Sequence, residues 1–247
     1  MTTGTTPTLE LNNGVTMPAL GLGVFQSPPE ETVFAVETAL RDGYRLIDTA
    51  AAYDNEREVG EGIRRSGIDR GEVFVTTKLW ISDYGYEQAL IGFDGCLRRL
   101  GLDYVDLFLL HHPVPSDFDG TVAAYKAAEQ MLADGRARAI GVSNFSERHI
   151  ENLIGQTEVM PAVNQIELHP FFTQQALRDF HAANNIITQA GHRSAASTGT
   201  APQTRARSTT RSSTRPSSSS PRSTAKRPRR SCSAGISSTA SPRSRSR

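Results

Sequence analysis

The hydrophobic pattern of residues 8–190 alternates between short apolar runs and longer segments in which apolar residues return every three or four positions. The runs predict strands, and the longer segments predict amphipathic helices. The expected strands cover residues 20–25, 46–47, 73–79, 105–111, 137–143, 162–167 and 186–190. The expected helices begin at Ser27, cover residues 55–66, 86–100 and 118–134, begin again after Ser146, and cover residues 174–184.

Residues at the ends of these elements refine the prediction. Ser27, Asn55 and Ser146 have side chains suited to capping the first backbone donors of a helix. Near the N-terminus, two short segments of alternating polarity flank Asn12-Asn13-Gly14. Because Asn-Gly supplies the positive φ angles of a tight turn, we expect a β-hairpin over residues 8–17.

Alternating strands and helices predict a parallel sheet. The nearly continuous apolar run at residues 105–111 is typical of a parallel strand covered on both faces. Seven strands with six helices between them indicate an α/β fold, a (β/α)₈ TIM barrel whose eighth unit is missing, and not a three-layer sandwich. Gly21 and Gly23 lack the G-x-G-x-x-G spacing, so close backbone approach to packing or to a ligand explains them better than a dinucleotide fold.

Four side chains able to take part in proton transfer lie at or just beyond expected strand ends: Asp48, Tyr53, Lys78 and His111. In a barrel these ends meet at one face, where catalytic groups collect. Each residue also has a structural alternative. Asp48 would be a salt-bridge partner, Tyr53 a packing residue and Lys78 a surface lysine. His111 and His112 would form a core pair or a metal-ligand pair, although no further Cys or His cluster supports zinc.

The motifs around these residues resemble those of the aldo-keto reductases. The stretch Asp48-Thr-Ala-Ala-Ala-Tyr-Asp-Asn-Glu-Arg-Glu-Val-Gly60 matches Asp-Thr-Ala-x-x-Tyr-x-Asn-Glu-x-x-Val-Gly at every fixed position. Four further matches follow in family order: Thr76-Thr-Lys-Leu-Trp80, Leu109-Leu-His-His-Pro113, Gly141-Val-Ser-Asn-Phe145 and Asn164-Gln-Ile-Glu-Leu-His-Pro170. The resemblance covers residues 8–190 and points to the bacterial diketogluconate-reductase-like branch. It implies that the N-terminal hairpin covers the bottom of the barrel.

The resemblance also implies NADPH-dependent reduction of small aldehydes and ketones to alcohols. Tyr53 would be the general acid, and Lys78 would lower the pKa of its phenol from an unperturbed value near 10. Asp48 would hold Lys78 charged and in place. His111 would hydrogen-bond the substrate oxygen and help to relay the proton.

Two further sets of contacts are implied by the resemblance. The cofactor set comprises Gly23, Val24, Asp48, Ser143, Asn144 and Gln165, of which the last three would hold the nicotinamide carboxamide. The substrate set comprises Phe25, Trp80 and His112. His112 departs from the Trp that is common at its position, which leaves the shape of the substrate there open.

The composition divides the chain near residue 190, although the net charge is only +1. Thirteen of the 27 Lys and Arg lie in residues 191–247, which contain no acid, so residues 1–190 combine 14 basic with 26 acidic side chains, a net charge of −12. Residues 191–247 also contain seventeen serines and no aromatic residue. Such a segment buries too little apolar surface to offset its ordering entropy, so we expect a disordered tail.

The same tail resembles the family in another reading frame. A T placed before the codons of Gly191-His-Arg-Ser194 regroups them into codons that permit Trp-Ser-Pro-Ile, close to the family's Trp-Ser-Pro-Leu. The same shift permits Val-Leu-Arg-Trp at residues 231–235 and Ile-Pro-Lys-Ser, the motif for the adenosine 2′-phosphate, at residues 244–247, and a following Val codon would create a stop. We therefore interpret residues 191–247 as out-of-frame translation. It would remove the last barrel unit, the aromatic residue that stacks on the nicotinamide and the 2′-phosphate cluster, which predicts an impaired enzyme.

Other features bear on location and partners. Cys96 and Cys232 lie on opposite sides of the boundary, so we expect no disulfide framework and a reducing cytosol. Met1 is followed by no apolar leader segment, and no run approaches the ~18 apolar residues of a membrane span, so we expect neither secretion nor a membrane. A monomer acting on a small carbonyl compound is expected. Two alternatives stay open: a catalytically dead barrel whose basic tail binds nucleic acid or acidic partners, and a partial barrel completed by a partner subunit.

Overall fold

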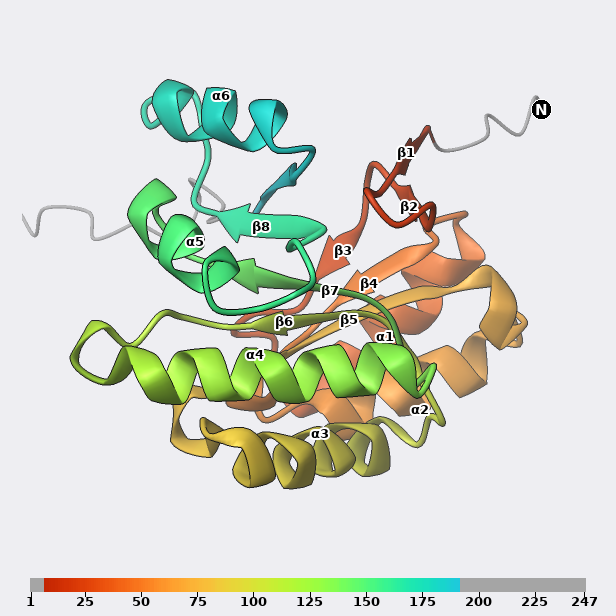
Figure 1. The fold of residues 1–247 in the computed structure, drawn as a ribbon. Helices are drawn as coiled ribbons and strands as arrows, with labels where there is room; N and C mark the ends of the chain where they lie inside the picture. The colour runs from red at the N-terminus through yellow and green to blue at the C-terminus, as the bar shows by residue number, and fades with distance from the viewer. Residues whose placement is uncertain (1–6, 192–247) are drawn as a thin grey trace, which may run out of the picture. The chain divides into compact units, whose positions relative to one another are not determined.

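The computed structural model describes residues 7–191, which form a curved parallel sheet with helices along its outer side (Figure 1). The sheet runs in chain order, each strand parallel to the next. Its strands are β3 (Leu22–Gly23), β4 (Leu46–Asp48), β5 (Phe74–Leu79), β6 (Val105–Leu110), β7 (Ala137–Ser143), β8 (Val163–Ile166) and β9 (Ile187–Ala190). This order is that of an unclosed (β/α)₈ barrel, so the predicted fold class is confirmed.

One α-helix lies between each strand of this sheet and the next. These helices are α1 (Pro29–Arg41), α2 (Glu56–Ser66), α3 (Tyr86–Leu100), α4 (Phe118–Ala133), α5 (Glu147–Ile154) and α6 (Gln175–Ala183). The first four pack against one another in sequence order. In Figure 1, α6 lies at the far end of the sheet from α1–α4. None of the helices within residues 7–191 is long and apolar enough to cross a membrane.

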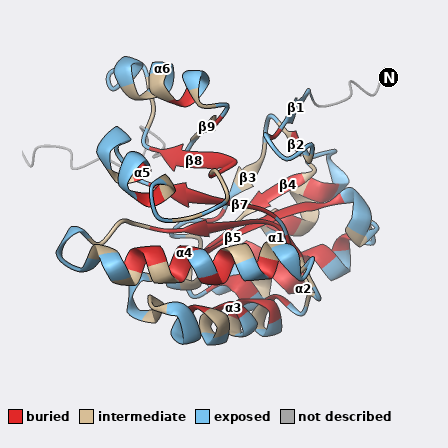
Figure 2. Cartoon of the chain, viewed as in Figure 1, coloured by how far each residue is buried: buried red, intermediate tan, exposed pale blue. Residues whose placement is uncertain are grey.

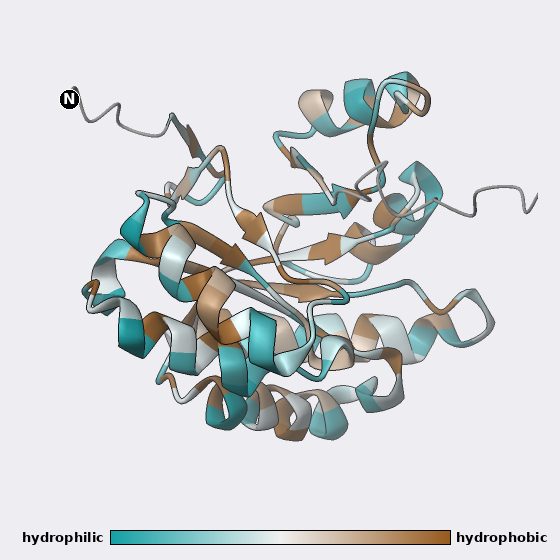
Figure 3. Cartoon of the chain, turned by 180° about the vertical axis from the view of Figure 1, so that it is seen from behind, coloured by the Kyte–Doolittle hydropathy of each residue, from teal (hydrophilic) through white to brown (hydrophobic). Residues whose placement is uncertain are grey.

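The sheet separates two apolar layers, because successive strand residues point to opposite faces. Outward residues such as Ile47, Val75 and Phe108 pack under the helices. Inward residues such as Leu46, Phe74 and Leu107 fill the concave side. Strands β4 to β8 are accordingly largely buried, and the outer helix faces are exposed and hydrophilic (Figures 2 and 3).

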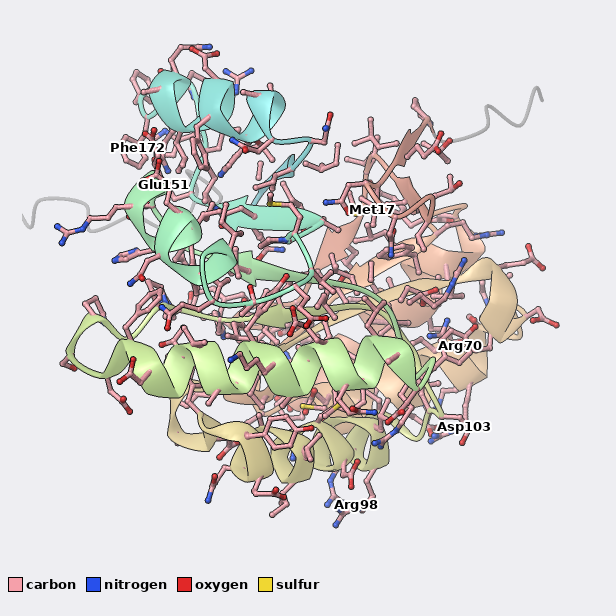
Figure 4. The ribbon with its side chains drawn as sticks, viewed as in Figure 1. Met17, Arg70, Arg98, Asp103, Glu151 and Phe172 are labelled. Carbon is pink, nitrogen blue, oxygen red and sulfur yellow. The ribbon has the colours of Figure 1, made fainter. Side chains whose placement is uncertain are left out.

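The N-terminal hairpin pairs β1 (Thr8–Glu10) with β2 (Thr16–Pro18). Its residues Leu11 and Met17 are 2% exposed and belong to the inward-facing apolar cluster, so the hairpin covers one end of the concave side, as predicted. Figure 4 shows Met17 at this position. Of the Asn13-Gly14 pair, only Gly14 has a positive φ (83°), so the expected turn of two such residues is wrong.

Three expected local features differ in the structure. The first barrel strand is only Leu22–Gly23, not residues 20–25. The side chains of Ser27 and Asn55 cap no helix: the N-cap of α1 is Pro28, and Asn55 stands at the N-cap of α2 but makes no cap hydrogen bond. The hydroxyl of Ser27 instead accepts a hydrogen bond from Thr32 at 2.9 Å. Ser146 does cap α5, in a capping box with His149.

The sheet is open between its first and last strands within residues 7–191, since β3 pairs only with β4, and β9 only with β8. Gly21 confirms the expectation of close packing, because a Cβ there would lie 2.2 Å from Leu46 Cδ2. Gly23 does not, because a Cβ there would meet no atom within 4 Å. The predicted disordered tail lies outside the described residues, apart from Gly191.

Candidate active site

The C-terminal ends of the strands bring the predicted polar residues, apart from the enclosed Lys78, to the wall of one cleft of about 1530 Å³. Asp48 ends β4, Ser143 ends β7, and Gln165 stands in β8. The strand registers place Gly23 opposite Asp48, and Ser143 opposite Gln165. The two-residue period of the strands turns these side chains to the same concave face.

Lys78, in β5, is the centre of the polar cluster. Its side chain is fully buried, which excludes the surface-lysine alternative. Its Nζ donates to Asp48 Oδ2 at 2.7 Å, to the Thr49 carbonyl oxygen at 2.9 Å and to the Tyr53 hydroxyl at 3.3 Å. A buried ammonium needs an opposite charge and full hydrogen bonding. Asp48 and the two oxygens provide both, so the predicted Asp48–Lys78–Tyr53 group is assembled.

Tyr53 lies on a short loop after β4, in the 3₁₀ turn η1 (Ala51–Tyr53). Its pKa is raised above the ordinary value of 10, chiefly because burial disfavours the phenolate, while Lys78 acts in the opposite direction. The expectation that the ammonium gives Tyr53 a net lowered pKa is therefore wrong for the protein without ligands. A phenol with a raised pKa holds its proton at neutral pH, which an acid must do before it donates.

His111 follows β6 and lies beside Tyr53, with ring centroids 5.6 Å apart. Burial, reinforced by the charge of Lys78, lowers the pKa of His111 to about 3, so its imidazole is neutral at physiological pH. Its Nδ1 is buried and has no hydrogen-bond partner. Because Nδ1 is enclosed, the accessible part of the imidazole, which lines the cleft, is the part that can hydrogen-bond an oxygen bound beside the phenol.

The predicted carboxamide residues surround the end of β7. The Ser143 hydroxyl donates to the Gln165 carbonyl at 3.0 Å, and the Asn144 amide donates to the His111 carbonyl at 3.0 Å. Asn144 has a left-handed backbone (φ 62°), which turns the chain away from the strand. Gln165 Nε2 donates to Asp48 Oδ1 and to Gln189 Oε1, both at 3.0 Å. The three residues are therefore adjacent to one another and to the Asp48–Lys78 pair.

The remaining predicted residues form the rim of the cleft, with one exception. Phe25 is 55% exposed and its ring lies 5.0 Å from that of Tyr53. Trp80 contacts the rings of His111 and His112 edge-on, at 5.1 and 5.6 Å. Val24 is the exception: its side chain is buried in the outer core, and the residue does not line the cleft.

Three residues of the site were missed by sequence reasoning. Gln189, in β9, receives the bond from Gln165, and its inward position follows from its register opposite Gln165. Thr49 and Asn55 join their side chains at 2.8 Å across the base of the Tyr53 loop. Asn55 belongs to the recognised motif, but its place before a helix suggested a cap, which obscured this contact.

Comparison with known proteins gives consistent matches. The profile of the "Aldo/keto reductase family" matches residues 18–230. Morphine 6-dehydrogenase of Pseudomonas putida is 59% identical over 187 residues, which are 76% of this chain and 63% of that protein. Glyoxal reductase of Bacillus subtilis is 46% identical over 191 residues, 77% of this chain and 68% of that protein. The chain thus spans less than two thirds of the first of these relatives.

Solved structures match over the same share of the chain. An aldo/keto reductase from Brucella melitensis has a TM-score of 0.73 and 50% identity, covering 75% of this chain and 72% of that one. A Bombyx mori aldo-keto reductase in complex with NADP has a TM-score of 0.71 and 34% identity, covering 76% of this chain and 66% of that one. Both identities are high enough for the similarity to extend beyond the fold.

Proposed function

The chain belongs to the aldo/keto reductase family, and from this premise we propose that its site reduces small aldehydes and ketones to alcohols with NADPH. The observation that carries the proposal is the buried Lys78 ammonium, which donates to both the Asp48 carboxylate and the Tyr53 hydroxyl. A phenol beside an ammonium and a neutral imidazole suits protonation of a carbonyl oxygen.

The residues present fit the nicotinamide part of this cofactor. Ser143, Asn144 and Gln165 carry both donors and acceptors, which a carboxamide requires, and their donors, bonded to protein oxygens in the structure, would exchange partners on binding. Gly23 leaves space beside Asp48, since a Cβ there would meet nothing within 4 Å. When bound, NADPH supplies the hydride. The residues proposed for its 2′-phosphate in the shifted frame lie outside the described part of the chain.

The protein's own residues supply the proton and hold the carbonyl group. Tyr53 gives its proton to the carbonyl oxygen as negative charge develops there, and the Lys78 ammonium stabilises the phenolate that is left. Asp48 holds Lys78 in its charged form. His111, which is neutral, hydrogen-bonds the same oxygen and orients it toward Tyr53. Phe25, Trp80 and the imidazole of His112 form the walls that exclude water.

Residues 191–247 are, in our proposal, the product of a shifted frame. The codon regrouping of residues 191–194, 231–235 and 244–247 supports this, and β9 keeps its register with β8 up to Ala190, the last residue before the shift. Among residues 7–191 no strand pairs with the outer edge of β9, so the cofactor side of the cleft is open along that edge. We therefore propose that the 247-residue chain turns over more slowly than a chain with the frame restored.

The test is oxidation of NADPH, followed by its absorbance, with glyoxal or another small aldehyde as substrate. The proposal predicts turnover by the restored chain, turnover at least about 100-fold slower by the 247-residue chain, and loss of both on Tyr53→Phe. An inactive restored chain would overturn the proposed activity. Equal rates for the two chains would overturn the proposed impairment alone. Sequencing the gene across the codons for Gln189 to Ser194 tests the reading frame directly.

A further inference from the structure

The loop that carries Tyr53 is closed at its base by two buried side chains. Thr49 Oγ1 donates to Asn55 Oδ1 at 2.8 Å, and these residues are 0% and 1% exposed. Between them the chain makes the turn η1 and then a left-handed residue, Asp54 (φ 54°). A short loop held by a bond between its two ends has few conformations open to it, so the position of Tyr53 follows from that bond.

The other end of the same amide holds a second loop. Asn55 Nδ2 donates to the Val24 carbonyl at 2.8 Å and to the Ser27 carbonyl at 3.4 Å. Phe25 lies between these two carbonyl groups in the chain, and its ring packs against Tyr53. One side chain therefore connects the loop of the proposed acid to the loop of the aromatic residue that covers it.

Thr49 extends this connection to Lys78. Its backbone carbonyl accepts from Lys78 Nζ at 2.9 Å, and its backbone N–H donates to the Thr76 carbonyl at 2.9 Å. The backbone of Thr49 therefore helps to hold the Lys78 ammonium in place. The hydrogen bond from the Thr49 hydroxyl to Asn55 then connects the Tyr53 loop to the same residue.

Asn55 gives up an ordinary role to make these contacts. It stands at the N-cap of α2, where Asn usually accepts from the helix backbone, yet its side chain makes no such bond. The site needs one acceptor, for Thr49, and donors for two carbonyl groups. A neutral amide has both, whereas a carboxylate has no donor and a hydroxyl has only one.

We propose that Asn55 is a positioning residue of the reaction, which sets Tyr53 against Lys78 through Thr49 and sets Phe25 over Tyr53 through Val24. This inference rests on the proposed function for its kinetic consequences, but its structural part does not. The two halves of the amide can be separated by substitution. Thr49→Val removes only the bond to Oδ1, while Asn55→Asp keeps that acceptor and removes both donors.

The kinetic test uses the 247-residue chain with NADPH and a small aldehyde. Thr49→Val is expected to lower kcat about tenfold and to keep the aldehyde KM within about twofold. The substitution removes the bond that positions the Tyr53 loop but keeps the bonds from Asn55 to the Phe25 loop. Asn55→Asp is expected to raise the aldehyde KM about tenfold with a smaller change in kcat. The control is Glu56→Gln, which alters the next residue, also buried, whose partners Thr77 and Arg99 lie outside both loops. Kinetic constants for both variants that equal those of the control would overturn the proposal.

Two measurements do not depend on turnover. In Asn55→Ala, amide hydrogen exchange is expected to rise in residues 22–27 and 49–55 and not in β5 or β6. The pKa of Tyr53, obtained from phenolate absorbance by subtraction of a Tyr53→Phe chain, is expected to fall toward 10, since burial is the larger influence on it. If Asn55→Ala does not fold, Thr49→Val, which keeps the shape of the side chain, is measured for residues 49–55 alone.

The outcomes separate the two proposals. A frame-restored chain that binds NADPH but never oxidises it contradicts the proposed function, and exchange and titration of the 247-residue chain then decide the role of Asn55. Unchanged exchange in both loops together with an unchanged Tyr53 pKa would overturn the positioning role, even in an active chain.

Discussion

The β4–β6 side of the cleft and the β7–β9 side differ in how deeply their strands are buried. Strands β5 and β6 are buried at every residue, whereas the four residues of β9 are half-buried or exposed. On the first side Lys78 is completely enclosed, and on the second Gln189 lies next to the open edge of the sheet. The proton-transfer group is therefore organised by strands that are covered on both faces. The proposed cofactor group lies on β7 and β8, which are also buried, but it borders β9, which is not.

The largest expected effect tests the first side. Tyr53→Phe removes the proposed acid but leaves a ring of similar shape against Phe25. We expect kcat to fall by about 10³, within the range for loss of a general acid, with binding of NADPH unchanged. Steady-state rates and titration of the fluorescence of bound NADPH would measure the two quantities. A variant that loses NADPH binding in parallel with kcat would show that the two sides are not separate.

Packing between α2 and α3 on the first side gives the next effect. A Cβ at Gly60 would lie 1.9 Å from the Leu100 carbonyl oxygen. Gly60→Ala is therefore expected to lower the free energy of unfolding by about 3 kcal/mol, measured by urea denaturation. The matched control is Gly155→Ala on the second side, where the nearest atom would be 3.4 Å away and φ is −66°. Equal losses in the two variants would contradict this account of α2–α3 contact.

The pH dependence of stability tests how α6 is held on the second side. His181 is the one buried residue of α6, and its ring nitrogens bond Asn164 at 2.9 Å and Thr188 at 2.8 Å. Burial lowers its pKa to about 4 from an ordinary value of 6.5. Between pH 6.5 and 4 the unfolded chain binds the proton and the folded chain does not, so stability is complete above pH 6.5 and falls as pH drops toward 4.

This contribution is at most about 3 kcal/mol, of which about 2 kcal/mol is lost by pH 5, and urea denaturation at pH 7.5 and pH 5 would measure that part. His181→Asn is expected to be less stable at pH 7.5 but to lose less on acidification. Part of the pH dependence of stability will remain in this variant, because the pKa of His111 is also lowered. An unchanged difference between the two pH values would show that His181 is not held in its neutral form.

The smallest expected effect concerns the proposed carboxamide contact. Gln165→Ala removes the amide that joins Asp48 to Gln189. We expect the Kd for NADPH to rise about tenfold, equivalent to about 1.4 kcal/mol, while kcat at saturating NADPH changes little. A loss confined to kcat would move Gln165 from the cofactor side to the proton-transfer side.

The fold was predictable because hydrophobic period and strand order are properties of the sequence itself. Apolar runs such as Val105–Leu110 indicated strands buried on both faces, and the motifs located Asp48, Tyr53, Lys78 and His111 at strand ends. The β3 strand was predicted too long, since the backbone leaves the sheet after Gly23 and no periodicity records that point.

Contacts between distant side chains were harder to predict. The partner of Gln189 follows from the register of β8 and β9, which only the folded sheet fixes. The Asn55 side chain had a local option, the helix cap, and a tertiary one, the bonds to Thr49 and Val24, and the tertiary bonds prevail. The pKa of Tyr53 was expected to fall because Lys78 is near, but the extent of burial, which only the structure gives, has the larger effect.

The most direct test of the central claim is the rate of NADPH oxidation with a small aldehyde, measured on the frame-restored chain and on the same chain carrying the substitution Tyr53→Phe. Our account predicts that the chain with Tyr53 consumes NADPH and forms the alcohol in equal amounts. It also predicts that the substituted chain binds NADPH but oxidises it about 10³ times more slowly. Equal rates in the two chains would contradict the assignment of Tyr53 as the acid, and with it the carbonyl reductase centre described above.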